Sequence, residues 1–128
     1  MRARLEDDPL ARLRTELDGF RASCGEKGET SLDTGLEYRP GEPVLVVARR
    51  RGRRWDFGDA GRAVELSGSP PGWLEAAGSV VAEEGMNVNR AGVVFAPAVE
   101  RPGRDLAALA LRIGETSRAV FAELLELE

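Results

Sequence analysis

Histidine is absent from this sequence, which also has a single cysteine, Cys24, and a single lysine, Lys27. Without histidine, the Ser-His-Asp type of triad, the common zinc sites and imidazole acid–base chemistry are excluded. One cysteine cannot form a disulfide within the chain. Cys24 has Glu26 nearby and no adjacent basic residue to activate its thiol, so we interpret it as an ordinary unpaired cysteine.

Long apolar runs are also missing, since no stretch approaches the roughly 20 residues that a membrane-spanning helix requires. The first ten residues, MRARLEDDPL, carry acids where a signal peptide has its apolar core. We therefore predict a cytoplasmic protein with no membrane contact. The length of 128 residues predicts a single domain, 1–128, in which 1–7 form a frayed N-terminus.

The remaining candidates for a metal or acid–base site are carboxylates near a predicted turn, Asp56, Asp59 and Glu65. No second type of ligand accompanies them, and nothing in the pattern places them on one face. We interpret Asp59 as bonding its own turn backbone, with Gly61 at a position of positive φ. The sequence thus predicts no catalytic residue, no metal, no cofactor and no enzymatic activity.

The hydrophobic pattern alternates between helical and strand periods along the chain. Helices are expected at 8–22, 69–85 and 102–127, and strands at 34–39, 44–49 and 53–57, with a hairpin over 86–99. We expect a loop at 23–33 and a short strand or helical turn at 62–66. The order α-β-β-β-α-β-β-α predicts an α+β fold, with a mostly antiparallel five-stranded sheet and three helices.

Three short motifs carry a resemblance to a known family: the strand VLVVA at 44–48, the turn DAG at 59–61 and the segment GMNVN at 85–89. From about Leu17 onward the chain resembles domain of unknown function 1828, found in bacteria and often in prophages. That resemblance implies a link to mobile elements and no known activity. The order of elements is also similar to that of type III secretion chaperones, which are small, acidic and dimeric.

The densest charge feature is five arginines in six positions at the tip of the first predicted hairpin: Arg49, Arg50, Arg51, Arg53 and Arg54. With Trp55 beside them they are candidate nucleic-acid contacts, because arginines grip phosphates and an aromatic ring stacks on bases. A net charge of −4 argues against a general nucleic-acid binder. We therefore favour a solvated turn and keep nucleic-acid binding as the alternative.

Surplus apolar surface predicts a partner. The strand at 44–48 is apolar on both sides, so both faces of the sheet need cover, and the helix at 102–127 begins apolar nearly all round. A two-fold homodimer is the commonest way to cover such surface. We predict a homodimer whose interface draws on the helices at 69–85 or 102–127 and includes at least one of Val80, Val81 and Leu111.

These observations predict a small cytoplasmic interaction or regulatory protein that acts by binding another protein. Two alternatives stay open. The first is a nucleic-acid binder that uses the arginine-rich hairpin at 49–54. The second is a secretion-chaperone-like protein that binds unfolded segments, which rests on the order of elements alone.

Overall fold

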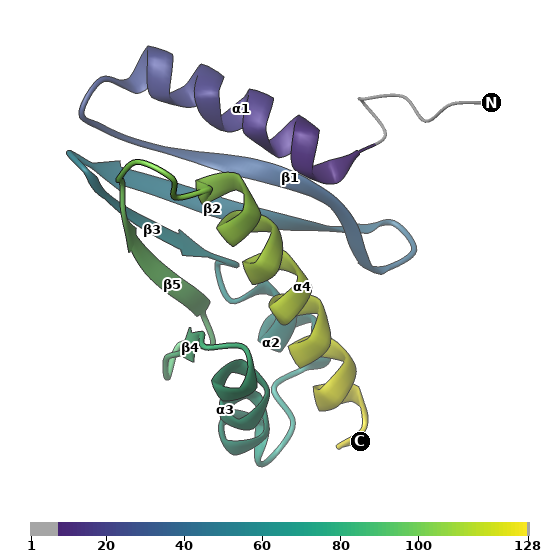
Figure 1. The fold of residues 1–128 in the computed structure, drawn as a ribbon. Helices are drawn as coiled ribbons and strands as arrows, with labels where there is room; N and C mark the ends of the chain where they lie inside the picture. Colours follow the sequence, from purple (N-terminus) through teal and green to yellow (C-terminus); the bar gives the residue numbers. More distant parts are fainter. Residues whose placement is uncertain (1–7, 128) are drawn as a thin grey trace.

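The computed structural model describes residues 8–127 and shows a five-stranded antiparallel sheet with four helices (Figure 1). The strand order is β1-β2-β3-β5-β4. In chain order, the elements are α1 (Pro9–Cys24), β1 (Lys27–Arg39), β2 (Glu42–Arg51), β3 (Arg54–Gly58), α2 (Arg62–Ser67), α3 (Trp73–Glu83), β4 (Asn87–Val88), β5 (Val94–Val99) and α4 (Leu106–Leu125). The predicted α+β class is confirmed, whereas the frayed segment 1–7 lies outside the described residues.

Two element predictions are wrong. The count of three helices misses α2, because the segment at 62–66 forms a helix of its own, so the order is α-β-β-β-α-α-β-β-α. The loop predicted at 23–33 is largely the first half of β1, which pairs with β2 from Lys27 onward. Leu32 is the only apolar core residue in that half of β1. The alternation of apolar and polar residues that predicts a strand is therefore absent from the sequence there. The antiparallel register with β2 holds it extended.

One face of the sheet carries the hydrophobic core. Val44, Val46 and Ala48 on β2 and Trp55 and Phe57 on β3 are all fully buried there. The helices α1 and α4 lie across this face, whereas α2 and α3 pack against α4, and α3 also contacts the edge strand β4 (Figure 1). No helix in residues 8–127 is both long enough and apolar enough to cross a bilayer.

The helix α4 is apolar nearly all round because it is the centre of the fold. Its sheet side contacts β1, β2, β3 and β5, and its other sides contact α1, α2 and α3. Asp105 caps its N-terminus by accepting a hydrogen bond from the Ala108 amide at 3.1 Å. The apolar excess predicted to mark a partner site is therefore buried within the chain itself.

The turn after β3 depends on a glycine in the left-handed region. Gly61 has φ +78° and precedes the first turn of α2, and its amide donates to the Asp59 carboxylate at 2.8 Å. This confirms the predicted roles of Asp59 and Gly61 in the turn. Side chains with a Cβ, and β-branched ones above all, resist this conformation.

Gly61→Val is therefore expected to lower the free energy of unfolding by about 1 kcal/mol or more. Gly61→Asn is the matched control, because asparagine tolerates the left-handed region far better than valine does. Chemical denaturation of the three proteins measures the effect. Equal stability of wild type and Gly61→Val would contradict the strain argument.

Candidate interaction surface

The second face of the sheet has no helix over it among the described residues, and we call it the open face. Side chains on β1, β2, β3 and β5 alternate between the core and this face, as the strand period requires. Its members fall in cross-strand rows, which in order from the β2–β3 hairpin tip are Lys27–Arg51–Arg54–Val99, Glu29–Arg49–Asp56–Pro97, Ser31–Val47–Gly58–Phe95 and Asp33–Leu45. Both faces were expected to need cover, and among the described residues helices cover only one of them.

The centre of the open face is apolar and hollowed. Leu45 is 41% exposed, and Val47 and Phe95 are half-buried. Two hollows of about 360 and 380 Å³ lie side by side there, and Val47 and Ala60 line both of them. An apolar surface with adjoining hollows is a shape that another polypeptide can fill with side chains.

Two residues that line the hollows have unusual backbone features. Gly58 contributes no side chain to the middle row, and a Cβ added there would lie 3.3 Å from a methyl group of Val93. Ala60 has φ +59°, an uncommon conformation for a residue with a Cβ. Gly58 and Ala60 thus line the second hollow with little side-chain volume.

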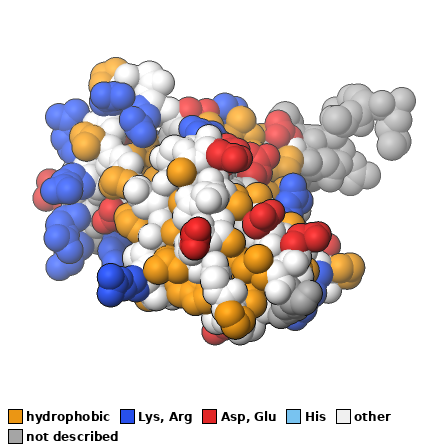
Figure 2. Space-filling view, turned by 90° about the horizontal axis from the view of Figure 1, so that it is seen from below, with side chains coloured by type: hydrophobic (Ala, Val, Ile, Leu, Met, Phe, Trp, Pro, Cys, Tyr) orange, Lys and Arg blue, Asp and Glu red, His pale blue; other side chains and the backbone are white. Residues whose placement is uncertain are grey.

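Charge divides the open face into two ends. The end at the β2–β3 hairpin tip carries Lys27, Arg51 and Arg54, all exposed. In Figure 2 the Lys and Arg side chains gather on the left, where this tip lies in Figure 1. The opposite end carries four acids and two arginines, and both arginines pair with Glu42: the acids are Asp33, Glu37, Glu42 and Glu65, and the arginines are Arg39 and Arg62. The face is therefore basic at one end and acidic at the other.

Three of the five tip arginines are engaged within the chain. Arg49 pairs with Glu29 at 2.7 Å, and Arg53 donates to the Glu100 carbonyl at 3.0 Å. Arg50 pairs with Glu100 at 3.3 Å and also donates to the Gly25 carbonyl. These contacts join the tip to the end of α1 and to the segment after β5, so the tip is a structural junction as well as a basic end.

Trp55 cannot stack on a base, which corrects its place among the candidate nucleic-acid contacts. The ring is fully buried, stacked on Phe57 at 5.7 Å and edge-on to Phe20 at 5.9 Å. The guanidinium groups of Arg21 and Arg50 lie 5.8 and 5.6 Å from its centroid. The alternation that exposes Arg54 turns Trp55 into the core.

The helix residues predicted for a dimer interface are only partly accessible. Val81 is 3% exposed and packs within the chain, so it cannot form the interface in this structure. Val80 and Leu111 are half-buried against the core. Leu74 on α3 is 40% exposed and is the large apolar side chain most open to solvent on that helix.

A network of buried hydrogen bonds joins three distant segments beneath the open face. The Ser117 hydroxyl on α4 donates to the Asp59 carboxylate at 2.6 Å and lies 2.6 Å from the Tyr38 hydroxyl. Burial raises the pKa of Tyr38 to about 12, so that hydroxyl stays protonated and donates to Ser117. Asp59 and Ser117 are 1% and 0% exposed. The network connects the turn, α4 and β1, and its burial keeps a substrate from reaching it.

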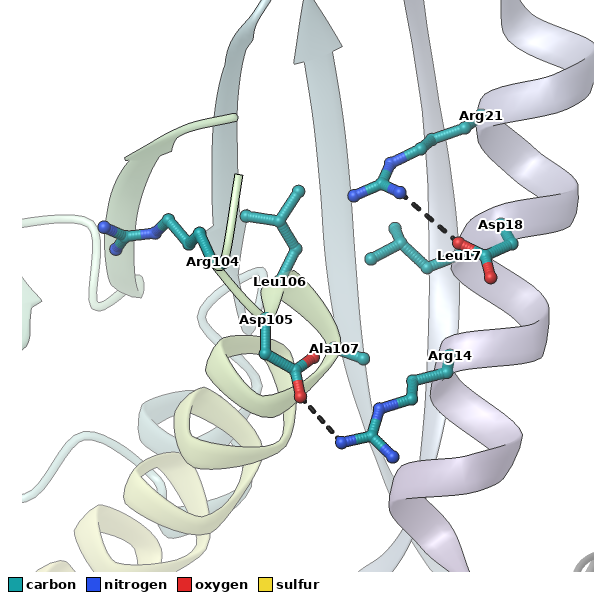
Figure 3. Close-up of a pocket in the computed structure, with 9 residues that line it drawn as sticks. Arg14, Leu17, Asp18, Arg21, Arg104, Asp105, Leu106 and Ala107 are labelled. Carbon is teal, nitrogen blue, oxygen red and sulfur yellow. Dashed lines mark hydrogen bonds and ion pairs between the residues drawn. The ribbon is translucent and has the colours of Figure 1, made fainter. Parts of the chain in front are cut away.

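A third hollow, of about 310 Å³, lies between α1 and the start of α4 (Figure 3). Leu17 and Leu106 lie between the two helices there, and Arg14 bridges them by pairing with Asp105 at 2.7 Å. This hydrogen bond lowers the pKa of Asp105 below its ordinary value. Arg21 also pairs with Asp18, so the ion pairs in this hollow hold the two helices in place, while Arg104 lines it without an ion pair among the described residues.

No group of three or more His, Cys, Asp or Glu side chains within residues 8–127 is arranged to hold a metal ion. Comparison with protein-family models, with curated proteins and with solved structures finds no significant match. The resemblances to domain of unknown function 1828 and to secretion chaperones therefore stay predictions from the sequence.

Proposed function

We propose that this protein is a small cytoplasmic interaction protein that acts by binding another polypeptide, and that the open face is its binding surface. The observation that carries the proposal is the pair of adjoining hollows on an uncovered sheet face with exposed Leu45. In a soluble protein, apolar surface that polar residues surround is typical of an interaction site. The link to mobile elements rests on the family resemblance alone.

Protein binding is favoured over nucleic-acid binding. A base-stacking platform needs an accessible aromatic ring, and Trp55 is fully buried. Arg49 and Arg50 are already paired with Glu29 and Glu100, which leaves less positive charge free for phosphates. The hollows at the centre of the open face are lined by apolar groups and by charges of both signs, which suits a polypeptide better than a phosphate backbone.

Site-specific photocross-linking tests the proposal. A photoreactive phenylalanine analogue replaces Leu45 on the open face or, as the matched control, Leu74 on α3, which is equally exposed. After irradiation of cells that produce each variant, we expect discrete protein adducts from position 45 and not from position 74. No discrete adduct from position 45, or the same adducts from both positions, would contradict the proposal.

A further inference from the structure

We propose that the polypeptide bound by the open face is a second copy of this chain, packed sheet against sheet about a two-fold axis. The inference rests on the proposed function, because it names the partner of the same surface. A two-fold axis that relates two facing sheets lies in the plane between them. When the axis runs across the strands, each strand faces its own equivalent in the opposite direction; when it runs along them, the directions stay parallel.

The charge distribution selects the antiparallel arrangement. It places the basic end of each copy over the acidic end of the other, whereas the parallel arrangement sets like charges together. Lys27 on β1 then faces Glu37 of the second copy, because both lie on β1 at opposite ends of the open face. Arg54 at the start of β3 likewise faces Glu65, which follows the end of β3 on α2. Because the axis is two-fold, each of these contacts occurs twice in the dimer.

The apolar centre is self-complementary in the same arrangement. The row that contains Val47, Gly58 and Phe95 lies midway between the two ends, so it meets its own copy near the axis. One row away, Leu45 comes to lie over the row of Arg49 and Asp56, beside the hollow that Gly58 leaves open. The exposed leucine of each copy thus fills a hollow of the other.

The size of the open face sets the expected affinity. Four strands about 4.8 Å apart, with β2 about 34 Å long, give a face of roughly 600 Å² per copy, at the small end of specific interfaces. Aligned sheets pack with their strand directions within about 30° of each other, which the natural twist supplies. We therefore expect a dissociation constant in the micromolar range, so that dilution separates the copies.

Charge reversal at the two ends tests the geometry. One variant carries Lys27→Glu and Arg54→Glu, which makes both ends of its open face acidic. The other carries Glu37→Lys and Glu65→Lys, which makes both ends basic. All four side chains are exposed, so the fold should tolerate the changes, and circular dichroism melting curves check that it does. Sedimentation velocity over a concentration series at low salt then gives the dissociation constants.

We expect the wild type to dimerise and each variant alone to bind itself at least about tenfold more weakly, because like charges then face each other. An equal mixture of the two variants should dimerise again, since acidic ends then meet basic ends. A wild type that stays monomeric overturns the inference. Variants that each dimerise as tightly as the wild type also overturn it, and point instead to the helix surface around Val80 and Leu111.

The cross-linking experiment separates this inference from the proposed function. Irradiation of the purified protein with the photoreactive residue at position 45 should give an adduct of twice the mass of the chain. If that adduct is absent while position 45 still gives discrete adducts in cells, the second copy is excluded and protein binding by the open face stands. If position 45 gives no adduct in either setting, both proposals fail.

Discussion

Asp59→Ala is expected to lower the free energy of unfolding by about 3–5 kcal/mol, a large share of the total for a domain of this size. One carboxylate oxygen accepts the amides of Gly61 and Val94 at 2.8 and 2.9 Å, and the other accepts the Ser117 hydroxyl. Alanine would leave all three donors buried without a partner. Each unsatisfied buried donor lowers the free energy of unfolding by about 1–3 kcal/mol.

Asp59→Asn is the control for this effect. Its amide oxygen can still accept the two backbone amides, while its NH2 group can donate to Ser117, which then turns its own hydrogen toward Tyr38. We therefore expect a much smaller loss than for alanine. Urea unfolding monitored by circular dichroism measures both variants, and an alanine variant within about 0.5 kcal/mol of wild type would exclude the network as a stabilising element.

The same pair of proteins gives a dependence on pH with a defined sign. Burial raises the pKa of Asp59 above its ordinary value of 3.8, although hydrogen bonds from Ser117 and the backbone act in the opposite direction. The folded protein thus holds this proton to a higher pH than the unfolded chain does. Stability from the protonated group is fully present below 3.8 and falls as pH rises through the folded pKa.

The stability of wild type relative to Asp59→Asn should accordingly decrease as pH is raised from about 4. Comparing the two proteins at each pH removes the contributions of the other carboxylates, which titrate in both. Asp105 is one of these, and its lowered pKa gives a trend of the opposite sign. A difference that stays constant, or that grows with pH, would show that the pKa of Asp59 is not raised in the folded state.

Gly114→Ala is expected to destabilise the protein by about 1–3 kcal/mol, although alanine is the better helix former. Gly114 lies in α4 where it crosses the sheet, and a Cβ there would come 2.7 Å from the Thr34 methyl group and 3.4 Å from a methyl group of Val44. Thr34 cannot turn away without loss, because its hydroxyl donates to the Val44 carbonyl at 2.7 Å and accepts the Leu36 amide.

Gly19→Ala is the matched control in α1. A Cβ at Gly19 would meet nothing within 4 Å, so the same substitution should stabilise by about 0.5–1 kcal/mol through helix propensity alone. Differential scanning calorimetry should therefore show melting temperatures that move in opposite directions. A Gly114→Ala protein as stable as wild type would mean that α4 lies farther from the sheet than the structure has it.

Local sequence patterns determined most of the elements of this protein. In β3 the alternation of residue types is enough to put Trp55 and Phe57 on one face and Arg54 and Asp56 on the other, which is the arrangement in the structure. The turn at Asp59 and Gly61 was also predicted correctly, because turn geometry depends on residues that are adjacent in the chain. The absence of histidine removed whole classes of chemistry before any fold was known.

Tertiary structure alone decided which surfaces are free. The helices α1, α2 and α3 cover the surplus apolar side chains of α4, whereas the apolar side chains of β2 on the open face stay accessible. The local sequence pattern does not show which of the two apolar surfaces is covered. Asp59 likewise bonds to Ser117, 58 residues later. Periodicity reports which side chains share a face, but the partner of a face is set by long-range packing, which depends on the whole chain at once.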